Sequence, residues 1–264
     1  MKRVRALLAK ELLDLQRNGA ALVPVVLVTL LSLALPFGIA IGIPLLTGQR
    51  LGDDVELARI SVVAGAHEEL SSDGRVQLFL FQQFLLLFLM TPITGAMSLA
   101  AHAVVGEKQA RTLEPLLATP ITTVELLIAK VLGALLPTLA ISFAGVAVYI
   151  AGIAILGVPG VARAMLTGRT ALLACVVGPA AALVSLQTAI IISSRVNDAR
   201  TAQQFGVLII IPLTAVVVAQ FVGSLWLTPT TLAFAGLGLA GVWILLTLFS
   251  AALFERESIL TRWR

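Results

Sequence analysis

The sequence contains few charged residues and has long stretches with none. Only 12% of its 264 residues are Asp, Glu, Lys or Arg, 59% are hydrophobic, and the mean hydropathy is +1.03. Such a balance excludes a soluble domain of ordinary composition. Charge-free stretches of 32, 31, 32, 25 and 54 residues occupy positions 18–49, 76–106, 131–162, 170–194 and 201–254. Since about 20 apolar residues cross the hydrocarbon core, each stretch can span a membrane and the last can span it twice.

Residue types that usually carry catalysis, metal binding or nucleotide binding are also scarce. The single cysteine, Cys175, falls in a predicted span and has no partner for an intrachain disulfide. The two histidines, His67 and His102, are isolated and therefore poor metal ligands. None of the four lysines stands in a glycine-rich loop that could hold phosphates. We expect no catalytic site, no metal and no cofactor on this chain.

The fold expected from this pattern is all-α, a polytopic membrane protein with six transmembrane helices. Pro229 and its neighbouring threonines divide the longest stretch, because proline removes a backbone donor and threonine can cap a new helix. We expect residues 20–264 to form a single transmembrane domain. Its spans are predicted near 20–46, 76–105, 126–156, 170–194, 205–227 and 232–254.

Residues 1–19 are predicted to form an amphipathic helix in the cytoplasmic interface. Glu11 lies close to the apolar arc of this helix, so its amphipathicity is imperfect. A simple basic topology anchor is the alternative reading. The apolar side of the helix consists of Val4, Leu7, Leu8, Leu12 and Leu15.

The distribution of basic residues predicts which side of the membrane each loop occupies. With a cytoplasmic N-terminus, 13 of the 18 Lys and Arg residues lie inside and 5 lie outside. The positive-inside rule therefore places both termini in the cytoplasm. The first outside loop, 47–75, has a net charge of minus three, which we interpret as a solvated loop rather than a cation site. The spread of basic residues also argues against nucleic-acid binding.

Proline and glycine within the spans predict bends and close helix approaches. Gly133, Gly145 and Gly152 recur at packing spacings along the third span. Bends are expected wherever proline frees a backbone carbonyl. The prolines concerned are Pro24, Pro36, Pro44, Pro92, Pro137, Pro179 and Pro212.

Four glutamines are the most polar uncharged side chains at membrane depth: Gln82, Gln83, Gln187 and Gln220. An unpaired amide in hydrocarbon costs several kcal/mol, so each needs a partner. They are candidates for lining a substrate route, but for any single one we favour hydrogen bonding to a neighbouring helix. Charge-free spans argue against a proton-coupled or ion-coupled carrier.

The loop between the second and third predicted spans has a specific pattern. Its residues 107–114 read Glu-Lys-Gln-Ala-Arg-Thr-Leu-Glu, and Leu116, Leu117, Thr119 and Pro120 follow. With segments 121–130, 193–204 and 254–257, this loop resembles the permease subunits of ATP-binding-cassette (ABC) transporters of the type-two exporter family. Arg111 departs from the glycine that is frequent at its position.

The resemblance implies that a coupling helix at about 107–119 docks on an ATPase. The residues given this partner-binding role are Glu107, Lys108, Arg111, Thr112, Glu114, Thr119 and Pro120. It further implies two copies of a cytoplasmic ABC ATPase that bind ATP and Mg, and a second permease copy in a homodimer or heterodimer. The complex is expected in the inner membrane of a prokaryote, in contact with membrane lipid.

The sequence leaves three functions open. The leading one is an exporter permease that couples ATP hydrolysis on a partner to substrate movement. An ATP-independent pore or secondary carrier is the second. The third is a membrane subunit that supports maturation of an extracytoplasmic enzyme. Nothing in the sequence selects the substrate.

Overall fold

The computed structural model describes residues 2–17, 19–54, 57, 61, 69–109, 123–196, 198, 201, 204–205, 207–222 and 227–253. Within these ranges the regular structure is helical, which confirms the predicted all-α polytopic fold. The α-helices are α1 (Lys2–Arg17), α2 (Gly19–Phe37), α3 (Ile43–Thr47), α5 (Ser72–Phe84), α6 (Met90–Gln109), α8 (Thr123–Leu156), α9 (Val161–Met165), α10 (Gly168–Leu172), α11 (Gly178–Arg195), α13 (Val207–Phe221) and α14 (Pro229–Leu253). Between them lie the π-helical turns η1 (Gly38–Gly42) and η4 (Leu173–Val177) and the 3₁₀ turns η2 (Leu51–Asp53) and η3 (Leu85–Leu89).

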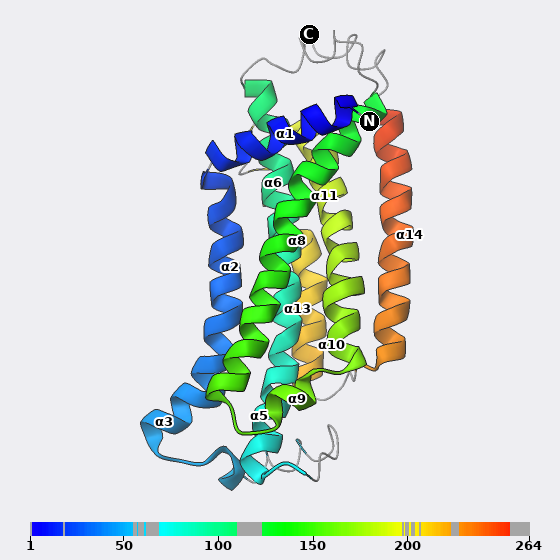
Figure 1. Ribbon diagram of the computed structural model, residues 1–264. Coiled ribbons are helices and arrows are strands. Elements are labelled where there is room, and N and C mark those ends of the chain that lie inside the picture. Colours follow the sequence, from blue (N-terminus) through cyan, green and yellow to red (C-terminus); the bar gives the residue numbers. More distant parts are fainter. Residues whose placement is uncertain are drawn as a thin grey trace.

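The long helices run side by side, and α1 lies across one end of the bundle (Figure 1). In the described residues, five helical segments are long and apolar enough to cross a membrane. These segments are Ala21–Thr47, Ser72–Gly106, Ile128–Leu156, Gly168–Ser193 and Pro229–Ser250. The span predicted at 205–227 corresponds to α13, whose described apolar part, Ile210–Gln220, is shorter.

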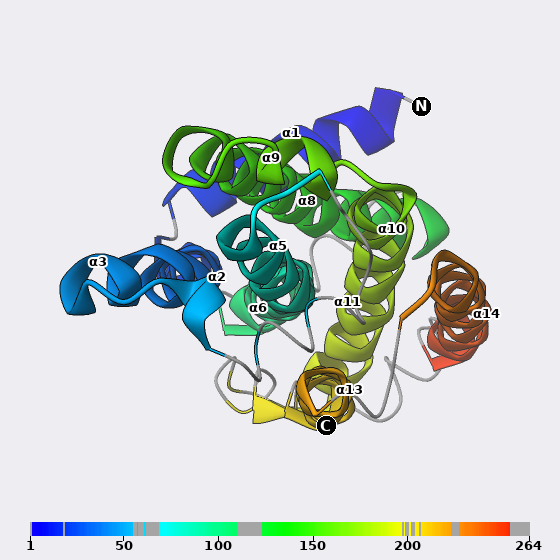
Figure 2. The same ribbon diagram turned by 90° about the horizontal axis from the view of Figure 1, so that it is seen from below.

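The continuous helix of α5, η3 and α6 occupies the centre of the bundle, with α2, α8, α11 and α13 around it (Figure 2). In its most apolar part 83% of the residues are buried within the protein, against 22% for the first and third spans and 11% for α14. The outer helices therefore direct their remaining apolar surface to lipid or to another protein chain.

A proline removes one backbone hydrogen bond near the junction of η1 and α3, and a glutamine side chain replaces the missing donor. Pro44 has no amide hydrogen, so the carbonyl of Ala40, four residues earlier in η1, loses its helical donor. Gln77 on α5 replaces that donor: its Nε2 donates to the Ala40 carbonyl at 3.2 Å. The Oε1 of the same amide accepts the Val158 N–H at 2.9 Å, and Gln77 is thereby bonded to two other segments.

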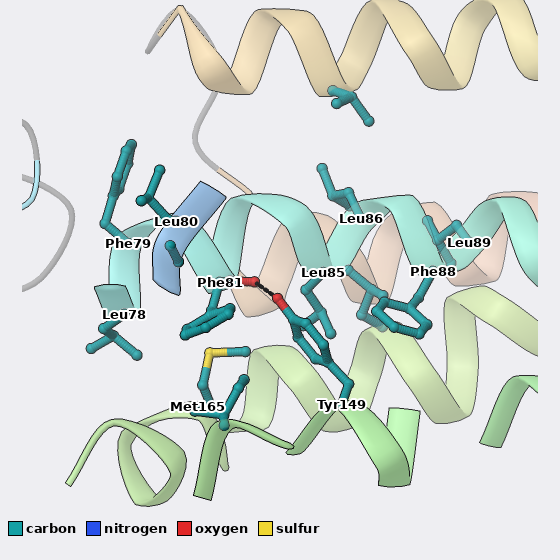
Figure 3. Close-up of a cluster of buried hydrophobic side chains, with 14 of the residues drawn as sticks. Leu78, Phe79, Leu80, Phe81, Leu85, Leu86, Phe88, Leu89, Tyr149 and Met165 are labelled. Atoms are coloured by element: carbon teal, nitrogen blue, oxygen red, sulfur yellow. Dashed lines mark hydrogen bonds between the residues drawn. The ribbon is translucent and has the colours of Figure 1, made fainter. Parts of the chain in front are cut away.

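An aromatic cluster fills the core between α2, α5 and α8 (Figure 3). Tyr149 is fully buried, and its hydroxyl donates a 2.9 Å hydrogen bond to the backbone carbonyl of Phe81. The rings of Phe37, Phe81 and Phe88 surround it with centroid distances of 4.9 to 5.7 Å. These tilted and edge-on contacts stabilise the core beyond the area they bury.

Glycines of α8 permit the close helix approaches that their spacing predicts. A Cβ on Gly152 would lie 2.6 Å from the Phe37 ring, and one on Gly145 would lie 3.0 Å from the Thr29 methyl. A Cβ added to Gly133 would lie 2.7 Å from the Glu11 Cβ, so this glycine lets α1 approach α8.

Candidate functional site at the α1 end of the bundle

An ion pair holds α1 against the membrane helices. The Nζ of Lys130, on the second turn of α8, lies 3.4 Å from Oε1 of Glu11. The same ammonium donates a 3.1 Å hydrogen bond to the backbone carbonyl of Ala103 on α6. Lys130 therefore joins α1, α6 and α8 at one point.

Both charges of this pair are shielded from solvent. The side chain of Lys130 is 5% exposed and that of Glu11 is 10% exposed. Burial explains why Glu11 interrupts the apolar face of α1: its carboxylate faces α8 rather than water. Lys10, on the exposed side of α1, lies 3.9 Å from the same Glu11 oxygen and pairs at 3.7 Å with Asp14, whose side chain is 58% exposed.

A small cavity of about 60 Å³ lies beside the ion pair. Glu11, Asp14, His102 and Gly133 contribute to its wall. The Nδ1 of His102 lies 2.9 Å from the carbonyl of Ser98, one turn earlier on α6. The volume is sufficient for a few water molecules, which can hydrate the carboxylates.

The contact of Lys130 with Glu11 and Ala103, called the joint below, lies near the two ends of the loop predicted to couple to an ATPase. The predicted residues Glu107 and Lys108 belong to the last turn of α6. The remaining five, Arg111, Thr112, Glu114, Thr119 and Pro120, lie outside the described residues. The helices α6 and α8 flank this loop, and the bond from Lys130 to Ala103 ties them together close to both of its ends.

The structure places the four predicted glutamines as follows. Gln83 and Gln220 form a reciprocal pair between α5 and α13, in which Gln83 Nε2 donates to the Gln220 carbonyl at 3.3 Å and Gln220 Nε2 donates to Gln83 Oε1. Gln187 on α11 is 2% exposed, and Gln82 is partly buried. One glutamine pair thus bonds two helices, and Gln187 does not belong to it.

Sequence reasoning did not single out Glu11 and Lys130 as a pair, or Gln77. Glu11 and Lys130 are 119 positions apart, and no local pattern connects them. A usable signal was the charge of Glu11 on an otherwise apolar helix face. For Gln77 the signal was Pro44, which frees a carbonyl but does not indicate which donor will reach it.

Comparison with known proteins identifies the family. No curated protein and no solved structure matches the chain significantly. The family model described as ABC-2 family transporter protein matches residues 5–235, which include most of α1, the charged loop and the first five predicted spans. Together with the apolar helices, this match assigns the chain as an integral membrane protein. The chain belongs to the ABC-2 transporter family and is a membrane permease component of an ABC transporter.

Proposed function

We propose that this permease is an exporter. It forms a dimer with a second permease copy and binds two copies of a separate cytoplasmic ATPase. ATP hydrolysis on those subunits moves a substrate out of the cell across the inner membrane of a prokaryote. Both termini and the loop 107–120 face the cytoplasm, in agreement with the 13 basic residues counted on that side.

The observation that supports coupling to an ATPase is the contact of Lys130 with Glu11 and Ala103. A force on the loop 107–120 acts on α6 and α8, which flank it. Because Lys130 bonds both Glu11 on α1 and Ala103 on α6, we expect the three helices to move together when the loop is displaced. Because α6 is part of the central helix, such a movement reaches the core of the bundle.

The distribution of charges supports ATP-driven transport over ion-coupled transport. Charged residues within the five candidate spans lie near their ends, as Asp73, Lys130 and Arg169 do. Ion-coupled carriers usually place acidic or basic groups at the middle of the membrane. The energy for transport is therefore expected from a partner subunit.

The experiment is a charge reversal in the loop. Arg111→Glu and Glu114→Arg should reduce co-purification of the ATPase and substrate-stimulated ATP hydrolysis, while membrane insertion is retained. Arg163→Glu is the matched control, because Arg163 is an exposed arginine on α9 at the opposite end of the bundle. Normal transport by both loop variants, or an equal loss in the control, would reject the assignment.

A further inference from the structure

The helix α3 lies at the end of the bundle opposite α1 (Figure 1). It borders a cleft of about 320 Å³. Apolar side chains of η1 and α3 form one wall, and Leu51 and Val158 belong to the lining as well. The polar part of the lining comes from Gln49, Arg50, Asp73 and Gln77. The lining of one small space therefore includes an arginine, an aspartate and two glutamines beside an apolar wall.

The neighbouring residues locate this cleft at the boundary of the hydrocarbon region. Leu45 and Leu46 on α3 are 82% and 86% exposed, so they need a lipid environment. The α3 helix ends at Thr47 and is capped by Gly48, whose positive φ of 69° turns the chain. Arg50 follows two residues later and therefore lies at the level of the lipid headgroups.

The polar side of the cleft is held in place by the backbone around it. The Gly52 N–H donates a 2.7 Å hydrogen bond to Oδ1 of Asp73, which fixes the segment after Arg50 against the start of α5. Gln77 is fixed by its bonds to Ala40 and Val158. Neither Arg50 nor Asp73 forms an ion pair with another residue in the described part of the chain.

We propose that this cleft binds the headgroup of a zwitterionic phospholipid, phosphatidylethanolamine. The phosphate lies against the Arg50 guanidinium, and the ammonium donates to the Asp73 carboxylate. The volume accommodates the headgroup and glycerol, while the acyl chains lie outside along Leu45 and Leu46. The carboxylate favours phosphatidylethanolamine over phosphatidylglycerol, because the glycerol headgroup has no ammonium to pair with Asp73 and leaves the phosphate charge beside it uncompensated.

Lipid binding at this site does not depend on transport direction or on the ATPase, so its failure would leave the proposed function intact. The test is native mass spectrometry of the full chain with an equimolar mixture of phosphatidylethanolamine and phosphatidylglycerol. We expect one tightly retained lipid, with phosphatidylethanolamine preferred. Arg50→Gln should weaken its retention about fivefold, the effect of one basic group near a headgroup.

Two further variants test whether Asp73 sets the lipid preference and whether the effect of Arg50 is specific to the cleft. Asp73→Asn keeps an oxygen that can accept the Gly52 N–H, so the thermal midpoint should be retained while the preference for phosphatidylethanolamine disappears. Arg163→Gln removes an exposed arginine at the same end that does not line the cleft, and lipid retention should be unchanged. The proposal is overturned if no lipid is retained, if Arg50→Gln behaves like Arg163→Gln, or if Asp73→Asn keeps the preference.

Discussion

Replacing Lys130 with methionine tests how firmly α1 is attached to the membrane helices. Removing one member of a buried ion pair typically costs about 3 to 5 kcal/mol, because the other charge stays buried without its partner. Three features of this joint reduce that value. The Nζ of Lys10 lies 3.9 Å from Oε1 of Glu11 and remains as a second basic group when Lys130 is replaced. The distance of 3.4 Å exceeds that of an ideal charged hydrogen bond, and the adjacent cavity of about 60 Å³ can hydrate Glu11. We therefore expect a loss of about 1.5 to 3 kcal/mol.

The assay is reversible unfolding of the purified chain in mixed micelles, measured for Lys130→Met, Glu11→Gln and the double variant. Because the two single changes remove the same interaction, the double variant should lose about 1 to 2 kcal/mol less than the sum of the two. Asp14→Asn is the matched control: it removes a pairing of Lys10 with an exposed carboxylate, which contributes about 0.5 kcal/mol or less. Additive single effects, or an equal loss for Asp14→Asn, would refute the structural role of the joint.

Three further substitutions test the packing of the bundle, each by the same unfolding assay. Gln77→Leu should cost about 2 to 4 kcal/mol, because it leaves one buried carbonyl and one N–H without partners; a loss below 1 kcal/mol would contradict the bridging role. Gly152→Ala should destabilise because its Cβ would lie 2.6 Å from the Phe37 ring, whereas Gly238→Ala, with open space around it, should not; equal effects would count against the close approach. Tyr149→Phe should cost about 1 kcal/mol by removing one buried hydrogen bond while keeping the ring, and wild-type stability would argue against that bond.

The sequence predicted those parts of the fold that depend on local composition. Charge-free stretches are long enough to identify spans, because the hydrocarbon core excludes charge over a fixed length. The span predicted at 76–105 lies within the helical segment Ser72–Gly106, and that predicted at 170–194 overlaps Gly168–Ser193. The predicted ends of the spans differ by a few residues from the helix ends in the structure, because capping and proline decide where a helix ends.

Contacts between distant segments could not be predicted in the same way. Gln83 and Gln220 are 137 positions apart, and each reads only as a polar residue that needs a partner. The same holds for Glu11, whose position close to an apolar face was read only as imperfect amphipathicity and did not identify Lys130. Pairing of this kind follows from helix packing, on which single-sequence periodicity carries no information.

The central claim is that the loop 107–120 transmits ATPase movement to the membrane helices at the α1 end. The most direct measurement is site-specific photocrosslinking in native membranes, with a photoreactive amino acid at position 114 or, as control, at position 163. A crosslink from 114 to the ATPase subunit, with none from 163, is the predicted result. No ATPase adduct from 114, or an equally strong adduct from 163, would contradict the account.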